Sequence, residues 1–221
     1  AEEHVEGMKE ERGHSHEDEE EESHDEEEHF LHSAEETEEE HNEHVHTMDE
    51  HVWTSPGNAI DIVEHITEEL CSLDSEHGQT YKDNAEAYET QLKELDTAFR
   101  DVVENAKNHT LLFGDRFPFR YFAAEYGLEY YAAFSGLASD TEPSAATMAF
   151  LINKVKEEHI PVVLKMELSN DNIANAIAEA CDVPVKVFYS SHNISAKQFE
   201  AGVTYLDLMK ENVETLKEAL R

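Results

Sequence analysis

Residues 110–136 read TLLFGDRFPFRYFAAEYGLEYYAAFSG and contain the pattern that decides the fold. The apolar run over residues 110–113 predicts a short buried strand. Residues 119–126 then favour a short helix, which Gly127 closes because glycine commonly ends helices. Residues 128–134 predict a second strand. A strand, a helix and a strand in this order indicate a parallel pair of strands joined by a crossover helix.

The same alternation continues to the end of the chain. Apolar patterns predict helices over residues 144–157, 170–181 and 196–220 and strands over residues 161–165 and 185–189. The order βαβαβαβα predicts an α/β lobe over residues 109–221, with a four-stranded parallel sheet covered on both faces. Ligands of such sheets bind outside the carboxyl ends of the strands. The segments expected there are Gly114-Asp115-Arg116, Ser135-Gly136, Met166-Glu167 and Ser190-Ser191-His192.

Two helices are expected before the sheet, in a linker and spine segment over residues 49–108. Ser55 is a suitable N-cap, and Pro56 a suitable first residue, for a helix that runs to about Cys71. Apolar residues at spacings of three and four then predict a longer helix of roughly thirty residues. Such a helix spans about 45 Å, which suits a spine between two lobes. Cys71 and Cys181 allow one disulfide, although two free thiols are at least as consistent with the sequence.

The first 48 residues have a different composition from the rest of the chain. Residues 1–50 hold 23 acidic residues, nine histidines and two basic residues, within a chain of 221 residues and net charge −36. This composition predicts a low-complexity tract over residues 1–48 without a core of its own. Imidazole and carboxylate both bind zinc, so several weak metal sites are expected. The candidate ligands in the tract are His14, His16, His41, His44 and His46. The alternative is an acidic, solvated linker in which histidine is only compositional.

The negative charge also excludes some partners. Nucleic acid phosphates and anionic membrane surfaces repel so acidic a chain, and cations are the partners expected instead. No apolar run is long enough to cross a bilayer, and no signal peptide or lipidation motif is present. The chain begins without an initiator methionine, which we interpret as a fragment or processed form. The sequence leaves open whether a targeting segment has been removed from it.

Four residues near the expected strand ends are candidate metal ligands. Glu167 follows the third strand and His192 the fourth, so both fall at one edge of the sheet. Asp115 follows the first strand, and His51 can join from the segment before the first helix. Two histidines with one or two carboxylates are a normal ligand set for a divalent metal. Taken singly, His51 is well explained as a surface or capping histidine, and Asp115 as the ion-pair partner of Arg116.

Residues 49–58, DEHVWTSPGN, resemble the D-x-H-x-W-x-S-P-x-N motif of the zinc/manganese solute-binding proteins of ABC transporters. Residues 119–122 (FRYF) and 126–128 (YGL) are similar to the F-x-Y-F and Y-G-L segments of that family, and residues 205–220 resemble its closing helix. The resemblance makes His51 a metal ligand and the acidic tract the His-rich loop of the zinc-specific members. It implies two α/β lobes joined by a long helix. It also implies extracytoplasmic capture of a divalent metal and delivery to an ABC membrane permease, with no enzymatic activity.

The chain departs from the family pattern at three points. The family has a histidine or glutamate ligand three residues before Phe119, where Arg116 stands here. Arginine cannot bind a metal, so either Asp115 substitutes or that ligand is lost. Serines occupy the position of the acidic ligand after the last strand, and His192 is the expected substitute. The N-terminal lobe, with its own histidine ligand, is absent from this chain, so the expected metal affinity is weaker than that of the whole protein.

Two other functions stay open from the sequence. A rim of histidine and carboxylate could hold a metal that activates water, as in a metal-dependent hydrolase, although the chain has no HExxH motif or nucleophile elbow. A flavodoxin-like fold with an acidic tail could instead buffer cations or bind basic partners. Zn²⁺ is preferred as the metal because imidazole suits zinc, while the two carboxylates keep Mn²⁺ open.

Overall fold

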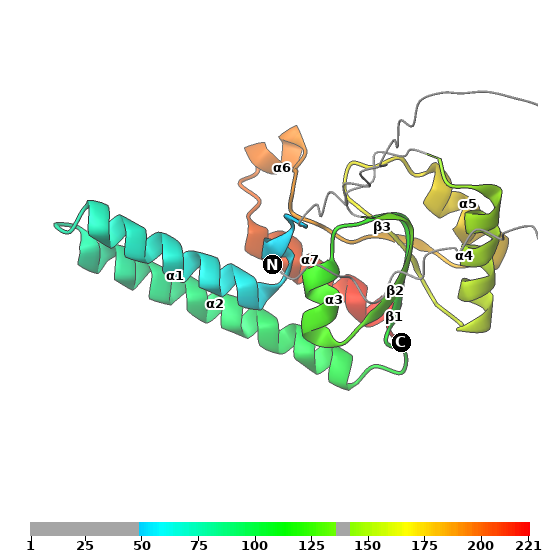
Figure 1. Cartoon of the computed structure of the whole chain (residues 1–221), viewed down its shortest axis with the longest axis horizontal. Helices are drawn as coiled ribbons and strands as arrows, with labels where there is room; N and C mark the ends of the chain where they lie inside the picture. The colour runs from blue at the N-terminus through cyan, green and yellow to red at the C-terminus, as the bar shows by residue number, and fades with distance from the viewer. Residues whose placement is uncertain (1–48, 136–141) are drawn as a thin grey trace, which may run out of the picture. The chain divides into compact units, whose positions relative to one another are not determined.

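The structure, a computed structural model, describes residues 49–135 and 142–221. The elements in chain order are η1 (Val52–Thr54), α1 (Pro56–Leu73), α2 (Gly78–Glu104), β1 (Thr110–Phe117), α3 (Arg120–Tyr126), β2 (Glu129–Ser135), α4 (Ala145–Glu157), β3 (Val163–Lys165), α5 (Asn172–Cys181), β4 (Val185–Val187), α6 (Ala196–Glu200) and α7 (Tyr205–Ala219). The four strands form one parallel sheet in the order β2-β1-β3-β4 (Figure 1). The predicted α/β fold is therefore confirmed.

Two predictions fall on parts of the chain outside the described residues. The His/Glu-rich tract over residues 1–48 is one of them, and with it the candidate ligands His14, His16, His41, His44 and His46. Gly136, expected at the end of the second strand, is the other.

The sheet buries side chains on both faces. Leu111 and Phe113 of β1 belong to a core shared with α2, α3 and α7, while Leu112 between them belongs to a second core shared with α4 and α5. All three side chains are fully buried. Side chains alternate along a strand, so an unbroken apolar run is what a strand covered on both faces requires. Each such burial contributes roughly 1.5–3 kcal/mol, which explains why this run decides the fold.

Aromatic contacts join the loop that follows β4 to the start of α3. The ring of Phe188, directly after β4, lies edge-on to Phe119 and Phe122, with centroids 5.0 and 5.4 Å apart. Phe188 is fully buried, as is Phe122. Edge-to-face pairs at this distance are favourable beyond the area they bury. The start of α3 and the end of β4 therefore hold a constant separation.

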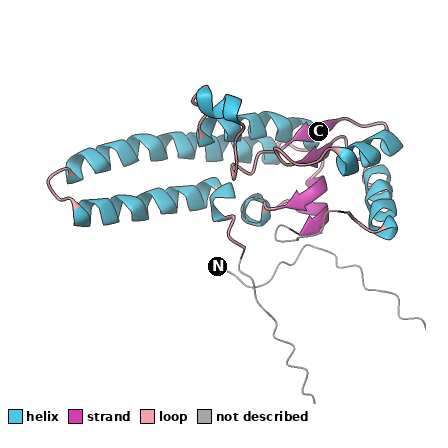
Figure 2. Cartoon of the chain, turned by 90° about the horizontal axis from the view of Figure 1, so that it is seen from above, coloured by secondary structure: helices cyan, strands magenta, loops and turns pink. Residues whose placement is uncertain are grey.

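Helices α1 and α2 lie side by side as an antiparallel pair (Figures 1 and 2). The predicted start of α1 is confirmed, because Ser55 Oγ accepts the backbone N–H of Asn58 at 3.1 Å and Pro56 is the first helical residue. Helix α2 is the predicted long helix and has 27 residues. Cys71 and Cys181 are free thiols.

Strand β1 is longer than predicted. It continues to Phe117, with an irregularity between Phe113 and Arg116, so Asp115 lies inside the strand rather than after it. Gly114 allows this course because a Cβ at that position would lie 2.5 Å from the Cα of Ala174. The backbones of β1 and α5 approach too closely there for any other residue.

The predicted final helix over residues 196–220 is wrong in one respect, because the structure divides it into α6 and α7. Gly202 between them has φ 71°, in the left-handed region that ends a helix. Thr204 then starts α7 with a capping box, in which its side chain and that of Asp207 each bond the other's backbone N–H. Among the helices of residues 49–135 and 142–221, none is long and apolar enough to cross a membrane.

Candidate metal centre

His51 and His192 come together beside the sheet. Their ring centroids are 5.8 Å apart, with the ring planes inclined at 46°. Trp53 packs against both rings, at 5.5 Å from His51 and 5.9 Å from His192. His51 lies just before η1, and His192 lies in the loop after β4. Two segments far apart in the sequence thus meet in one aromatic cluster outside the carboxyl end of β4, where ligands of parallel sheets bind.

The separation of the two rings suits a shared zinc ion. A tetrahedral zinc with Zn–N distances of about 2.0–2.1 Å places the ring centroids of two bound histidines roughly 5 Å apart. The observed 5.8 Å differs from this by less than ordinary side-chain adjustment. The separation of the two ring centroids is therefore close to that of two histidines that share one zinc ion.

Asp49 orients the ring of His51. One oxygen of its carboxylate, Oδ1, lies 2.8 Å from Nδ1 of His51 and accepts the backbone N–H of the same residue at 3.0 Å. With Nδ1 donating its proton to a carboxylate, Nε2 carries the lone pair that a metal needs. Burial raises the pKa of the Asp49 carboxyl, but the hydrogen bonds from His51 and the positive charge of Arg120 outweigh burial and leave that pKa below its ordinary value.

His192 is held by its backbone. Its N–H donates to Ser190 Oγ at 3.2 Å, and the intervening Ser191 has φ 58°, so the chain turns sharply there. The ring of His192 is exposed, whereas Ser190 is only 4% exposed. The hydroxyl of Ser191 is buried without a hydrogen-bond partner among the described residues. The turn therefore carries the chain from the buried Ser190 to the exposed His192.

The two expected carboxylates already accept hydrogen bonds from the protein. Both oxygens of Glu167 bind Ser190, one through its backbone N–H at 2.8 Å and the other through its hydroxyl at 2.7 Å. Asp115 is 8% exposed, and its two oxygens accept the backbone N–H groups of Met166, at 2.9 Å, and Arg116, at 2.8 Å. Asp115 thus ties β1 to the end of β3.

The structure brings together two of the four expected ligands. Across residues 49–135 and 142–221 no group of three or more histidine, cysteine, aspartate or glutamate side chains is arranged to hold a metal. His51 and His192 form the pair, Glu167 reaches the loop of His192 through Ser190, and Asp115 lies within β1.

Sequence reasoning gave no part in the site to Asp49, Trp53 and Tyr205, whose hydrogen bonds support the pair. Asp49 carried a usable signal, since it stands two residues before His51 in the quoted motif. Trp53 donates its indole N–H to the carbonyl of Ser190 at 2.9 Å, and its own carbonyl accepts the hydroxyl of Tyr205 at 2.8 Å. Nothing in the sequence pattern indicates those last two bonds, because they join segments that are distant along the chain.

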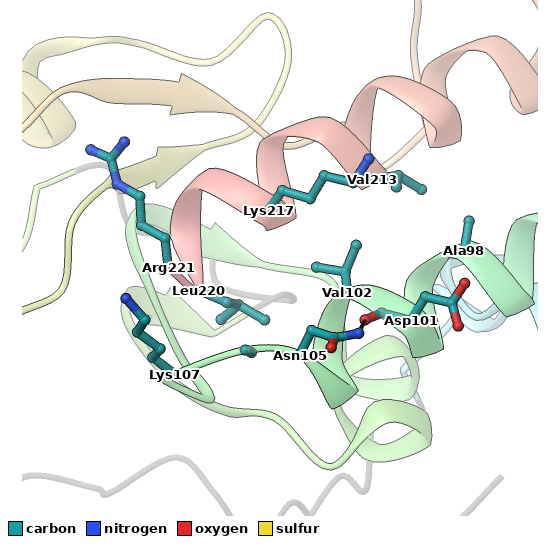
Figure 3. Close-up of a pocket in the computed structure, with 10 residues that line it drawn as sticks. Ala98, Asp101, Val102, Asn105, Lys107, Val213, Lys217, Leu220 and Arg221 are labelled. Atoms are coloured by element: carbon teal, nitrogen blue, oxygen red, sulfur yellow. Dashed lines mark hydrogen bonds between the residues drawn. The ribbon is translucent and has the colours of Figure 1, made fainter.

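A pocket of about 470 Å³ lies between the C-terminal parts of α2 and α7, away from the histidine pair (Figure 3). Val102, Val213 and Leu220 face its centre, with Lys107 at one end and Asp101 at the other (Figure 3). Its described lining residues include a single carboxylate and neither histidine nor cysteine. It therefore lacks a ligand set for a transition metal.

Comparison with known proteins points to one family. The family profile described as "ZnuA: Zinc-uptake complex component A periplasmic" matches residues 1–219. The chain is 34% identical over 186 residues to the zinc-binding lipoprotein AdcA of Streptococcus pneumoniae (strain ATCC BAA-255 / R6), which covers 83% of this chain and 37% of that protein. It is 31% identical over 175 residues to the high-affinity zinc uptake system protein ZnuA of Bacillus subtilis (strain 168), which covers 79% of this chain and 54% of that protein.

Solved structures agree with the sequence relatives. The Zn(II)-bound ZnuA-like domain of Streptococcus pneumoniae AdcA superposes with TM-score 0.67 at 32% identity, over 78% of this chain and 64% of that chain. The metal-dependent lipoprotein YcdH of Bacillus subtilis superposes with TM-score 0.70 at 31% identity, over 79% of this chain and 65% of that chain. The chain spans about a third to a half of the length of the two sequence relatives described above. The chain belongs to the ZnuA family of periplasmic zinc-uptake components.

Proposed function

We propose that this chain binds zinc outside the cytoplasm and passes the ion to the membrane permease of an ABC importer, without making or breaking covalent bonds. The observation that carries the proposal is the pair of imidazoles, His51 and His192, at a separation that one zinc ion can bridge. The family and its zinc-binding relatives support both the metal and the extracytoplasmic location.

His51 and His192 are the proposed ligands. Neutral imidazole is a preferred ligand of zinc, whereas manganese prefers oxygen, so a site built on two histidines favours zinc over manganese. The carboxylate of Asp49 behind His51 supports this choice, because a carboxylate on the far nitrogen fixes the orientation and the tautomer of the ligand. A four-coordinate zinc has two further positions, which we assign to water or to groups outside the described residues.

The proposal is tested by zinc titration of the full chain in competition with a chelator of known affinity. The matched variants are His51→Ala, His192→Ala and, as a control, His77→Ala. His77 is exposed near the turn between α1 and α2, where it pairs with Asp74. The strongest zinc-binding step of the titration is assigned to the histidine pair. Each of the first two variants should lower the affinity of that step by more than the roughly 10- to 100-fold that loss of an outer-shell partner costs. The control should retain that step.

Because the tract over residues 1–48 has histidines of its own, a weaker background of binding is expected in every variant. The informative quantity is therefore the affinity of the strongest step rather than the total zinc bound. Unchanged strongest-step affinity in both His51→Ala and His192→Ala would sink the proposal.

A further inference from the structure

We propose that Glu167 positions His192 through Ser190 and is a positioning residue for metal binding rather than a ligand of the ion. This inference rests on the proposed function, since it assigns a role within the same site. It is carried by the hydrogen bonds that converge on Ser190, a residue to which the sequence pattern gives no role.

Ser190 uses every polar group it has. Its backbone N–H and its hydroxyl donate to the two oxygens of Glu167. Its hydroxyl oxygen also accepts the backbone N–H of His192, and its carbonyl accepts the indole N–H of Trp53. Since Ser190 is buried, an unmade bond at any of these groups would be costly. The four bonds therefore favour one arrangement of the loop.

These bonds attach both histidine segments to one point. Trp53 lies two residues after His51 in the motif, and His192 lies two residues after Ser190. The distance between the imidazoles then depends on the bond from Trp53 to Ser190 and on the bond from His192 to Ser190. Glu167, at the end of β3, holds Ser190 to the sheet. A fixed separation lowers the ordering cost of binding, as preorganisation does in other sites.

A carboxylate can accept both bonds from Ser190, whereas an amide cannot. Two donors of Ser190 point at two different oxygens, and hydrogen bonds to an ionised acceptor are the strong ones. Glutamine has the same shape but offers one acceptor and one donor group. At the Ser190 hydroxyl the NH₂ group can only donate, so Glu167→Gln removes the charge-assisted bond from that hydroxyl and leaves its proton without the carboxylate, while it preserves the volume of the side chain.

The experiment is a double-mutant cycle with Glu167→Gln, Ser190→Ala and the double variant, each titrated with zinc against a competing chelator. If Glu167 acts through Ser190, each single variant should lower the strongest-step affinity by about 10- to 100-fold. The double variant should then lose little more than Ser190→Ala alone, because that variant already lacks the hydroxyl bond to Glu167 that Glu167→Gln weakens. Glu158→Gln is the control, since Glu158 accepts bonds from Tyr131 and Lys154 away from the histidines. Its affinity should equal that of the unaltered chain.

Cobalt(II) absorption at saturating metal separates a positioning residue from a ligand. A positioning role predicts that Glu167→Gln keeps the band positions and intensities of the unaltered chain, since the atoms on the metal stay the same. A changed cobalt spectrum in Glu167→Gln, or losses of affinity that multiply in the double variant, would overturn the inference in favour of direct ligation. Unchanged zinc affinity in Glu167→Gln would overturn it as well.

A second variant keeps the test decisive if Glu167→Gln does not fold. Trp53→Phe removes the indole N–H and keeps an aromatic ring, and should lower the affinity about 10-fold with an unchanged cobalt spectrum. Equal affinity of Trp53→Phe and the unaltered chain would contradict the inference. The failure of the proposed function looks different, because His51→Ala and His192→Ala would then retain the strongest step.

Discussion

At the scale of single residues, the hydrogen bond between Asp49 and His51 occupies Nδ1 and leaves Nε2 for the proposed zinc ion. Asp49→Asn keeps the shape of the side chain and removes its charge, so the hydrogen bond that orients the His51 ring becomes weaker. We expect zinc affinity to fall about 10- to 100-fold, measured by competition titration. Asp74→Asn is the matched control, because Asp74 bonds Nδ1 of His77 at 2.9 Å in the same way. Equal losses in both variants would show that the effect is not specific to the site.

Gly114 is a residue whose lack of a side chain positions β1 against α5. A methyl group there would meet the backbone of Ala174 at 2.5–2.8 Å, and backbone cannot move aside cheaply. Gly114→Ala should therefore lower the free energy of unfolding by about 1–3 kcal/mol in urea denaturation. Gly78→Ala, in the first turn of α2, is the control, because a Cβ there meets only the side chain of Cys71 at 3.6 Å or more. A smaller loss in Gly114→Ala than in the control would contradict the packing argument.

At the scale of elements, the sequence predicted most of the lobe because buried strands and amphipathic helices have distinct periods. It failed at the break between α6 and α7, although two signals were present. Gly202 marks the end of a helix, and Thr204 followed three residues later by Asp207 marks the start of another. The prediction gave more weight to the apolar pattern over residues 196–220 than to those local signals. For β1 the error ran the other way, because a local signal was followed too closely. The predicted strand ended before Gly114, since a glycine normally weakens a strand, whereas β1 continues to Phe117.

The capping box of α7 makes stability depend on pH in a defined direction. Hydrogen bonds from the hydroxyl and the backbone N–H of Thr204 hold the pKa of Asp207 below its ordinary value of 3.8. The ionised carboxylate therefore stabilises the folded state above pH 3.8, and this contribution is lost as the pH falls through the lower folded-state pKa.

Asp207→Asn removes this dependence and keeps the size of the side chain. We expect its urea midpoint to lie below that of the unaltered chain at pH 7, with the difference shrinking below pH 3.8. Glu214→Gln, on the same helix but paired at the surface with Lys217, should show a smaller difference at pH 7. A gap for Asp207→Asn that grows as the pH falls would contradict the capping argument.

At the scale of the whole molecule, the fold and the proximity of the two histidines followed from the sequence, and the hydrogen bonds of the carboxylates did not. His51 stood in a specific motif, and His192 followed a predicted strand, so both could be placed at the sheet edge. Glu167 and Asp115 were predicted as ligands from the same strand-end argument. Their carboxylates accept backbone N–H groups from neighbouring strands or loops, contacts that exist only once the strands have aligned. Position along the chain predicts proximity to a site, while tertiary hydrogen bonds decide what each group does there.

The charge of the chain belongs to the scale of the whole molecule too. Residues 1–50 hold 23 of its 52 acidic residues and nine of its 15 histidines, whereas both hydrophobic cores lie within residues 59–220. Deleting residues 1–48 should therefore lower the number of zinc ions bound per chain, measured by equilibrium dialysis, because imidazole and carboxylate groups bind zinc. The same deletion should leave the free energy of unfolding within about 0.5 kcal/mol, since both cores of the described residues lie within residues 59–220. It should also preserve the strongest zinc step, because His51 and His192 both remain. Loss of that step on deletion would instead assign a ligand of the strongest site to the tract itself.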